Sequence, residues 1–193
     1  RLHHFIIFMV GTGLRVDEAL SLEWEDIRSI DREKVINRQA TETTVSAYGK
    51  DFLSQLERYY LQINVGKSKT VPHTAYGTGS AYFAYHNLVK LYSSNPQFNC
   101  KVGEGTIFKL HSFREGLNSL LDEADLKFEK LGDSRVKRDS KSFRHTFIQF
   151  MLNKGMSSTA IAKMCGTSTE MIDKYYTSNM ALDTMMDTFN KVK

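Results

Sequence analysis

The stretch GTGLRVDEALSLEWEDI, residues 11–27, determines how the fold begins. Its two glycines follow the apolar segment at residues 2–10, and glycines in that position are typical of a helix end and a tight turn. Apolar residues then recur at three- and four-residue spacing, which predicts a second helix that starts near Val16 and packs one face. The apolar positions of that face are Val16, Ala19, Leu20 and Trp24.

Arg15 lies between the turn and the second predicted helix. The positive end of a helix dipole favours an anion at this place, and an arginine there adds a full charge. A single arginine beside a helix start is more often an ordinary surface residue. Its assignment to an anion site therefore depends on the rest of the chain.

Downstream of this stretch, β-branched residues predict a small antiparallel sheet. They are concentrated at residues 34–45 and 59–72, and residues 66–69 (GKSK) are typical of a hairpin turn. Residues 50–60, between the two segments, have the pattern of a short inserted helix.

The remainder of the chain is predicted to be helical. Helical patterns cover residues 81–92 and 106–126, and the charged residues 127–140 are predicted to form a connecting loop. From Lys141 onward, packed helices are predicted, with the last of them at residues 180–192.

Glycines and serines divide this last helical region. Breaks are predicted at Gly155 and Gly166, and Ser157 and Ser168 are predicted N-caps. The whole pattern predicts one domain over residues 1–193, mainly α with a small antiparallel β-sheet, an α+β fold.

The composition is that of a globular protein with a mildly basic surface. Hydrophobic residues make up 41% of the 193 residues and charged residues 25%, so a packed core without a stabilising metal or disulfide is expected. The net charge of +4 is compatible with a polyanionic partner.

Other features of the sequence bear on location. Cys100 and Cys165 form neither a disulfide framework nor a CxxC pair, which suits a reducing cytoplasm. The longest apolar run, residues 5–10, is too short to cross a bilayer. Because the chain starts at Arg1, without a methionine, we interpret it as a fragment of a longer protein.

A second arginine lies in the segment KSFRHTF, residues 141–147. Phe143 and Phe147 are four residues apart and mark a buried helix stripe. Arg144 is so close to that stripe that it needs hydrogen-bonding partners.

Three segments together resemble the tyrosine recombinases, the phage integrase family. Residues 11–27 are similar to the first arginine box, T-G-x-R-x-x-E-x-x-x-L-x-W-x-D-I, and KSFRHTF to the second, H/K-x-x-R-H-T. CGTSTEMIDKYYTS, residues 165–178, is similar to the closing G-H-x-x-x-x-x-T-x-x-Y segment. The resemblance covers nearly all of the chain. It implies the catalytic-domain fold of DNA breaking and rejoining enzymes, without the N-terminal core-binding domain.

The resemblance also implies which tyrosine is the nucleophile. Tyr176 lies nine residues after Thr167, the position of the histidine in the G-H pair, and 32 after Arg144. Both spacings match those of the family nucleophile. Tyr175 is then expected to be a packing aromatic.

Arg15 and Arg144 correspond to the clamp that holds the DNA phosphate. Attack on a phosphodiester builds negative charge on its nonbridging oxygens, and arginines can bind these oxygens bidentately at any working pH. Nearby cations also favour the phenolate form of a tyrosine, whose unperturbed pKa is near 10. The resemblance implies neither a metal nor another cofactor.

Lysines are expected to complete the catalytic set. Lys141 takes the place of the histidine in the second box, and lysine is an accepted variant there. The family's hairpin lysine, which protonates the leaving 5′-oxygen, corresponds to Lys67 or Lys69. We favour Lys67, because the residues from Lys69 onward, KTVP, resemble the R-T-V-P that follows the catalytic lysine. Arg15, Lys67, Lys69, Lys141 and Arg144 are the expected DNA contacts.

Two further positions differ in how they match the family. Thr167 replaces the histidine or tryptophan of the G-H pair, and its hydroxyl can donate one hydrogen bond. Glu18 matches the acidic position three residues after the first arginine and is expected to brace the site.

The resemblance implies a site-specific recombinase or integrase that forms a covalent 3′-phosphotyrosine. Its expected partner is double-stranded DNA, bound by a homotetramer on paired sites, with a monomer in the absence of DNA. The helix predicted at residues 180–192 would either contact a neighbouring protomer or pack on its own domain. A bacterial or phage protein, cytoplasmic and associated with the nucleoid, is expected. The alternatives are a type IB topoisomerase that relaxes DNA and a degenerate integrase that only binds it.

Overall fold

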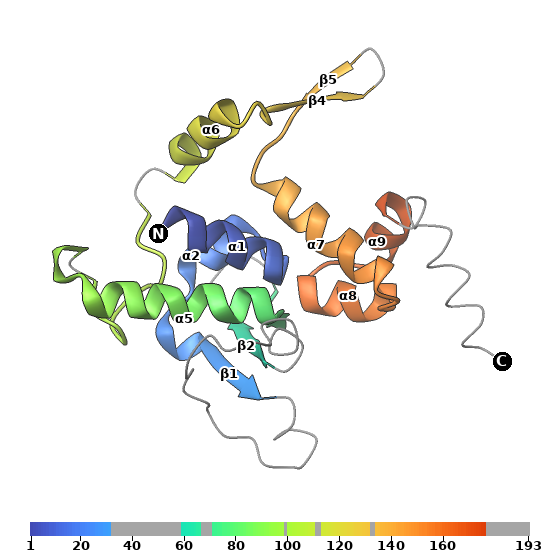
Figure 1. Ribbon diagram of the computed structural model, residues 1–193. Coiled ribbons are helices and arrows are strands. Elements are labelled where there is room, and N and C mark those ends of the chain that lie inside the picture. Colours follow the sequence, from blue (N-terminus) through green and yellow to red (C-terminus); the bar gives the residue numbers. More distant parts are fainter. Residues whose placement is uncertain (32–58, 67–70, 99, 111–112, 132–133, 177–193) are drawn as a thin grey trace, which may run out of the picture.

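The computed structural model is a mostly helical assembly around a small sheet (Figure 1). The residues that it describes are 1–31, 59–66, 71–98, 100–110, 113–131 and 134–176.

The predicted first helix is α1, Leu2–Thr12, and it ends at the glycine turn. Gly13 has φ 67°, in the left-handed region, and its N–H donates to the Met9 carbonyl at 3.0 Å. A residue without Cβ is favoured in that conformation, which confirms the predicted helix stop.

The second helix, α2, starts at Val16 as predicted but spans only Val16–Ser21. The chain leaves the helix at Leu22 (φ −63°, ψ 134°), and Trp24 belongs to a separate short 3₁₀ turn, η1, Trp24–Asp26. The predicted continuation of the helix through Trp24 is therefore wrong. Leu22 is buried in the core. The spacing of the apolar residues from Val16 to Trp24 fits a helix, although the helix itself ends before Leu22.

The sheet is antiparallel, with strand order β1-β2-β3. Its strands are β1 (Ile27–Asp31), β2 (Tyr59–Val65) and β3 (His73–Gly77). The predicted hairpin pairing is confirmed, because β2 pairs with β3, but residues 67–70 of its turn lie outside the described residues.

Two other predictions in this region fall wholly or mostly on residues outside the described ranges. The strand predicted at 34–45 and most of the helix predicted at 50–60 lie outside the described residues. The last two residues of that helix prediction, Tyr59 and Tyr60, are in β2 instead. They pair with Asp31 and Ile30 of β1, and this pairing overrides the local helical pattern.

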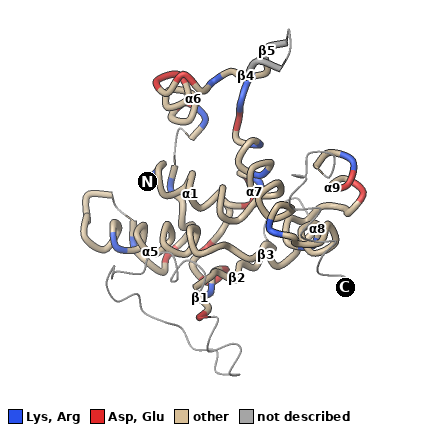
Figure 2. Tube along the Cα trace, turned by 45° about the vertical axis from the view of Figure 1, so that its right-hand side comes forward, with Lys and Arg blue, Asp and Glu red and all other residues tan. Residues whose placement is uncertain are grey.

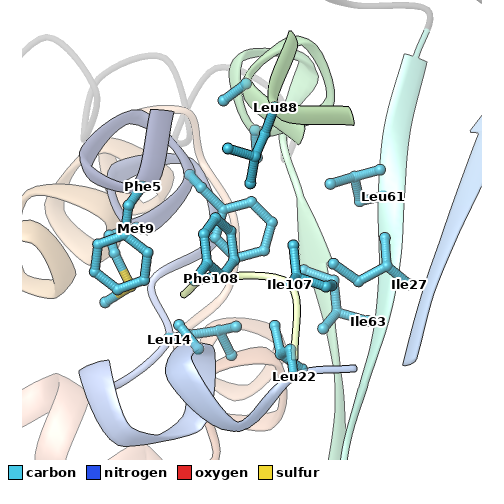
Figure 3. Close-up of a cluster of buried hydrophobic side chains, with 14 of the residues drawn as sticks. Phe5, Met9, Leu14, Leu22, Ile27, Leu61, Ile63, Leu88, Ile107 and Phe108 are labelled. Carbon is cyan, nitrogen blue, oxygen red and sulfur yellow. The ribbon is translucent and has the colours of Figure 1, made fainter. Parts of the chain in front are cut away.

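The main core lies where α1, the sheet and α5 (Gly79–Ser94) meet. Figure 3 shows Phe5 and Met9 of α1 on one side of this cluster and Leu61 and Ile63 of β2 on the other, with Phe108 and Ile107 between them. Helix α5 confirms the helix predicted at 81–92.

The helix predicted at 106–126 is shorter than expected: α6 spans Phe113–Glu123. Ile107 and Phe108 are in an irregular segment whose side chains are buried in the core, and the Ile107 N–H donates to the Leu22 carbonyl at 2.9 Å. That hydrogen bond and the burial of both side chains explain why residues 106–110 are not helical.

The charged segment predicted as a loop at 127–140 contains a hairpin instead. Strand β4 (Phe128–Leu131) pairs with β5 (Ser134–Lys137), and the Arg138 N–H extends the ladder to the Lys127 carbonyl at 2.8 Å. Cross-strand hydrogen bonds stabilise it despite its polar sequence. Figures 1 and 2 show this hairpin projecting away from the helices.

The final helices form a second, smaller core. They are α7 (Lys141–Asn153), α8 (Ser158–Cys165) and α9 (Thr169–Tyr175). Both N-cap predictions are confirmed, because the hydroxyls of Ser157 and Ser168 accept from N–H groups three residues later, each at 3.2 Å. The predicted helix at 180–192 lies outside the described residues. Among the described helices, none has the length and apolar character needed to cross a membrane.

Candidate active site

Arg144 connects the two cores through backbone carbonyls. It lies in the first turn of α7, where Nη1 donates to the Gly13 carbonyl at 2.8 Å and Nη2 to the Cys165 carbonyl at 2.6 Å. These partners end α1 and α8, so the half-buried guanidinium is fixed by two helix ends. The hydrogen-bonding partners that the sequence led us to expect for Arg144 are therefore backbone carbonyls.

Arg15 is held at the start of α2 by a buried carboxylate. Glu18, fully buried, accepts from Arg15 Nη1 at 2.7 Å and from the Arg15 backbone N–H at 2.7 Å. Arg15 Nη2 also donates to the Gly166 carbonyl at 3.1 Å, while its side chain stays 35% exposed. Glu18 therefore sits where a bracing role requires it.

The two arginines give this part of the surface an excess of positive charge. Burial lowers the pKa of the Arg144 guanidinium, and the charge of Arg15 lowers it further, whereas Glu18 acts in the opposite direction. A guanidinium nevertheless remains protonated in proteins. Arg15 is paired with Glu18, whereas the hydrogen bonds of Arg144 go to neutral carbonyls, so the charge of Arg144 suits an external anion.

Tyr176 and Tyr175 point in different directions at the end of α9. Tyr176 is half-buried against the smaller core, and its hydroxyl lies 2.6 Å from Nδ1 of His145. Tyr175 is 53% exposed, and the Lys174 ammonium lies 5.4 Å from its ring centre. Tyr176 is the tyrosine that lines the cavity shared by Arg15, Arg144 and Lys141, and Tyr175 is an exposed aromatic rather than the packing residue that we expected.

Burial raises the pKa of the Tyr176 hydroxyl above its usual value of 10.0, although the nearby Arg144 lowers it. The sequence led us to expect that cations favour the phenolate. Arg144 acts in that direction, but in the chain without DNA burial outweighs it. The phenol is neutral in this state, so its attack on phosphate requires removal of a proton.

Side chains from α2, α7 and α9 meet around a cavity of about 390 Å³. Its lining includes both arginines, Tyr176 and its neighbour His145. A smaller cavity of about 310 Å³ adjoins the same four residues and reaches Thr167. A larger cavity of about 880 Å³, between β3 and α8, is mainly apolar in its lining and includes none of these four.

The remaining predicted site residues have different outcomes. Lys141 is exposed at the start of α7 and lines the same cavity as Arg15 and Tyr176. Thr167 is half-buried and lines the smaller cavity. Lys67 and Lys69 lie outside the described residues, so their relation to the cavity stays a prediction.

Sequence reasoning did not assign a role to His145, although it belongs to the quoted segment KSFRHTF. It is 31 residues before Tyr176, and only the tertiary fold brings α7 and the residue that follows α9 close enough for the two side chains to meet. Within the described ranges, no group of three histidine, cysteine or acidic side chains is placed to hold a metal ion.

Residues 1–181 match the sequence model of the phage integrase family. A comparison with curated proteins gave no match.

Solved structures with the same fold include recombinases and an integrase. XerA recombinase superposes with a TM-score of 0.59 at 13% identity, over 100% of this chain and 57% of that one. The Tn1549 transposon integrase in complex with circular intermediate DNA gives 0.53 at 18% identity, over 97% and 56%. XerH recombinase bound to its difH substrate gives 0.56 at 16% identity, over 98% and 45%. The chain thus spans about half the length of these proteins, and at such identities the likeness shows the shared fold.

Proposed function

The chain belongs to the phage integrase family, and we propose that it cleaves and rejoins DNA strands through a covalent bond between Tyr176 and a 3′ phosphate. The observation that carries this proposal is the convergence of Arg15, Arg144 and Tyr176 on one cavity. These residues come from separate parts of the sequence, and they are the types that phosphoryl transfer to a tyrosine needs.

The two arginines would bind the nonbridging oxygens of the scissile phosphate. Their guanidinium groups are anchored to Glu18 and to backbone carbonyls, so they need little reorganisation when the phosphate arrives. Because charge on these oxygens grows during attack, fixed cations stabilise the transition state more than the bound substrate.

The phenol oxygen of Tyr176 would attack the phosphorus and displace the 5′-oxygen of the next nucleotide. Lys67 or Lys69 is our candidate to protonate that oxygen, and Lys141, beside Tyr176 in the cavity lining, is the alternative. Rejoining is the reverse step, in which a 5′-hydroxyl attacks the phosphotyrosine. The covalent link conserves the energy of the broken bond, so strand joining needs no nucleotide cofactor.

Thr167 would add a weaker contact. Its hydroxyl can donate a single hydrogen bond to a phosphate oxygen from the smaller cavity, which Tyr176 also lines.

We propose double-stranded DNA as the partner, with a homotetramer on two paired sites and a monomer without DNA. Structures of the Tn1549 integrase and of XerH that share this fold were solved with DNA, which supports the first part of this proposal. The named recombinases and integrase among the fold relatives favour strand exchange over a topoisomerase or a protein that only binds DNA.

A covalent trapping assay tests the proposed function. The substrate is a pool of nicked duplexes with random sequence around the nick. Cleavage near the nick releases a short fragment that carries the 5′-hydroxyl, so rejoining is prevented and the protein stays attached through its tyrosine. The wild-type chain and Tyr175→Phe should form an adduct that resists denaturation, and Tyr176→Phe should form none. An equal yield from the Tyr176→Phe variant would refute the assignment of the nucleophile.

A further inference from the structure

We propose that His145 is the proton acceptor for Tyr176 during DNA cleavage, an inference that rests on the proposed function. The hydroxyl of Tyr176 lies 2.6 Å from Nδ1 of His145, a distance typical of a strong hydrogen bond. The two rings are also near one another, with centres 5.4 Å apart. The imidazole is thus in contact with the atom that attacks the phosphate.

The surroundings of the pair support transfer of the proton from tyrosine to histidine. Burial raises the pKa of the phenol, so the hydroxyl does not ionise unaided at neutral pH. A neutral imidazole with its proton on Nε2 accepts at Nδ1, and the phenol hydroxyl then donates the hydrogen bond. This is the geometry that general base catalysis requires before the phosphate is attacked.

None of the other titratable and charged groups around the pair is as well suited to accept the proton of Tyr176. The groups that line the two cavities with His145 are Arg15, Asp17, Lys141, Arg144, Tyr175 and Tyr176. Arginine has no acceptor and lysine is an acceptor only when neutral. Asp17 has no hydrogen bond to Tyr176 among the described residues, whereas His145 does.

The step balances without a further reactant. As the Tyr176 oxygen bonds to phosphorus, its proton moves to Nδ1 of His145 and the bond from phosphorus to the 5′-oxygen breaks. The 5′-oxygen takes a proton from the lysine that acts as general acid. On rejoining, the 5′-hydroxyl gives its proton back to that lysine as it attacks the phosphorus, the bond to the Tyr176 oxygen breaks, and His145 returns its proton to that oxygen. The positive charge gained by the imidazole is offset by the negative charge growing on the phosphate.

A role limited to positioning the tyrosine gives different results from proton transfer. His145→Gln keeps a side chain able to hydrogen-bond the phenol but cannot take its proton. His145→Ala removes both functions and leaves space for free imidazole, because His145 is exposed at the cavity. His3, an exposed histidine of α1 that lines neither cavity, provides the matched control His3→Ala.

The experiment measures the rate of adduct formation on the randomised pool of nicked duplexes. General base catalysis typically contributes about a hundredfold or more, so His145→Ala and His145→Gln should both be slower by at least that factor, with His3→Ala unchanged. Added imidazole should accelerate His145→Ala and leave His145→Gln slow. A 5′-phosphorothiolate duplex should restore neither variant, because it assists the leaving group and not the nucleophile.

The outcomes separate this inference from the proposed function. If the wild-type chain forms an adduct, three results overturn the role of His145 without affecting the proposed function. They are a wild-type rate for His145→Ala, a wild-type rate for His145→Gln, and no acceleration of His145→Ala by imidazole. Failure of the wild-type chain to form any adduct overturns the proposed function and this inference with it. DNA binding measured in parallel should be equal in all variants, which shows that a slow variant is folded.

Discussion

Replacement of Gly13 by alanine should destabilise the chain by about 2–5 kcal/mol. Gly13 has φ 67°, and an alanine in the left-handed region costs about 1–2 kcal/mol. The added Cβ would also lie 2.3 Å from Cδ1 of Phe147, whose ring is 1% exposed and cannot move into solvent. Overpacking of that kind adds about 1–3 kcal/mol.

Gly155→Ala isolates the first contribution, the cost of the left-handed conformation. Gly155 also has a left-handed φ, 81°, but nothing lies within 4 Å of a Cβ built there. Its replacement should therefore cost only the conformational part, about 1–2 kcal/mol. Urea unfolding of the two variants, compared with wild type at one temperature, gives both free energies of unfolding.

The difference between the two variants is the decisive quantity. Gly13→Ala should be less stable than Gly155→Ala by about 1–3 kcal/mol. It should also cleave DNA more slowly than its residual stability explains, because the Gly13 carbonyl accepts from Arg144. Equal free energies of unfolding in the two variants would show that Phe147 does not pack against the turn, and would refute the reasoning.

Three further predictions concern the charge and titration of other groups. Binding to random-sequence DNA should weaken as salt rises, with a slope of about 0.9 per phosphate neutralised, and constant affinity from roughly 50 to 200 mM salt would contradict a DNA surface. Lys67→Ala should cleave a 5′-phosphorothiolate duplex at nearly the wild-type rate while staying slow on ordinary DNA, since a thiol pKa of about 8.5 makes sulfur the better leaving group. Rescue of Lys69→Ala instead would reverse our choice between the two lysines, and rescue of neither would make Lys141 the candidate. Burial lowers the pKa of His86 from 6.5 to about 4, so the unfolded chain binds this proton more readily, and the free energy of unfolding should fall as pH drops from 6.5 towards 4. His86→Asn should flatten that fall, and an unchanged pH dependence would show that His86 is not its source.

The sequence predicted best those elements whose patterns are local. The stop of α1 at Gly13 and the caps at Ser157 and Ser168 depend on side chains within a few residues of each end. Such signals are readable from sequence because no distant contact is needed to produce them.

Predictions were wrong where distant contacts decide the conformation. The residues around Ile107 have a helical pattern, but the hydrogen bond from its N–H to the Leu22 carbonyl keeps them out of a helix. The polar segment beginning at Phe128 resembles a loop, and only the cross-strand ladder to Lys137 reveals a hairpin. A single sequence contains no signal for either pairing.

The candidate site divides in the same way. Resemblance indicated Arg15, Arg144 and Tyr176, and the structure places all three on one cavity. The resemblance could not indicate that backbone carbonyls hold the arginines. Every residue has a carbonyl, and no side chain marks the ones that accept these hydrogen bonds. The contact of His145 with Tyr176 depends likewise on the tertiary arrangement of the last helices, which joins residues far apart in the sequence.

The most direct test is to locate the DNA on the protein by mass spectrometry of the trapped adduct. Trypsin cleavage after Lys174 gives a peptide that begins at Tyr175, so both tyrosines are in one peptide and fragmentation between them is required. We predict that the nucleotide mass is found on Tyr176 and that Tyr175 is unmodified. Nucleotide mass on Tyr175, or on any residue outside this peptide, would contradict the proposed mechanism.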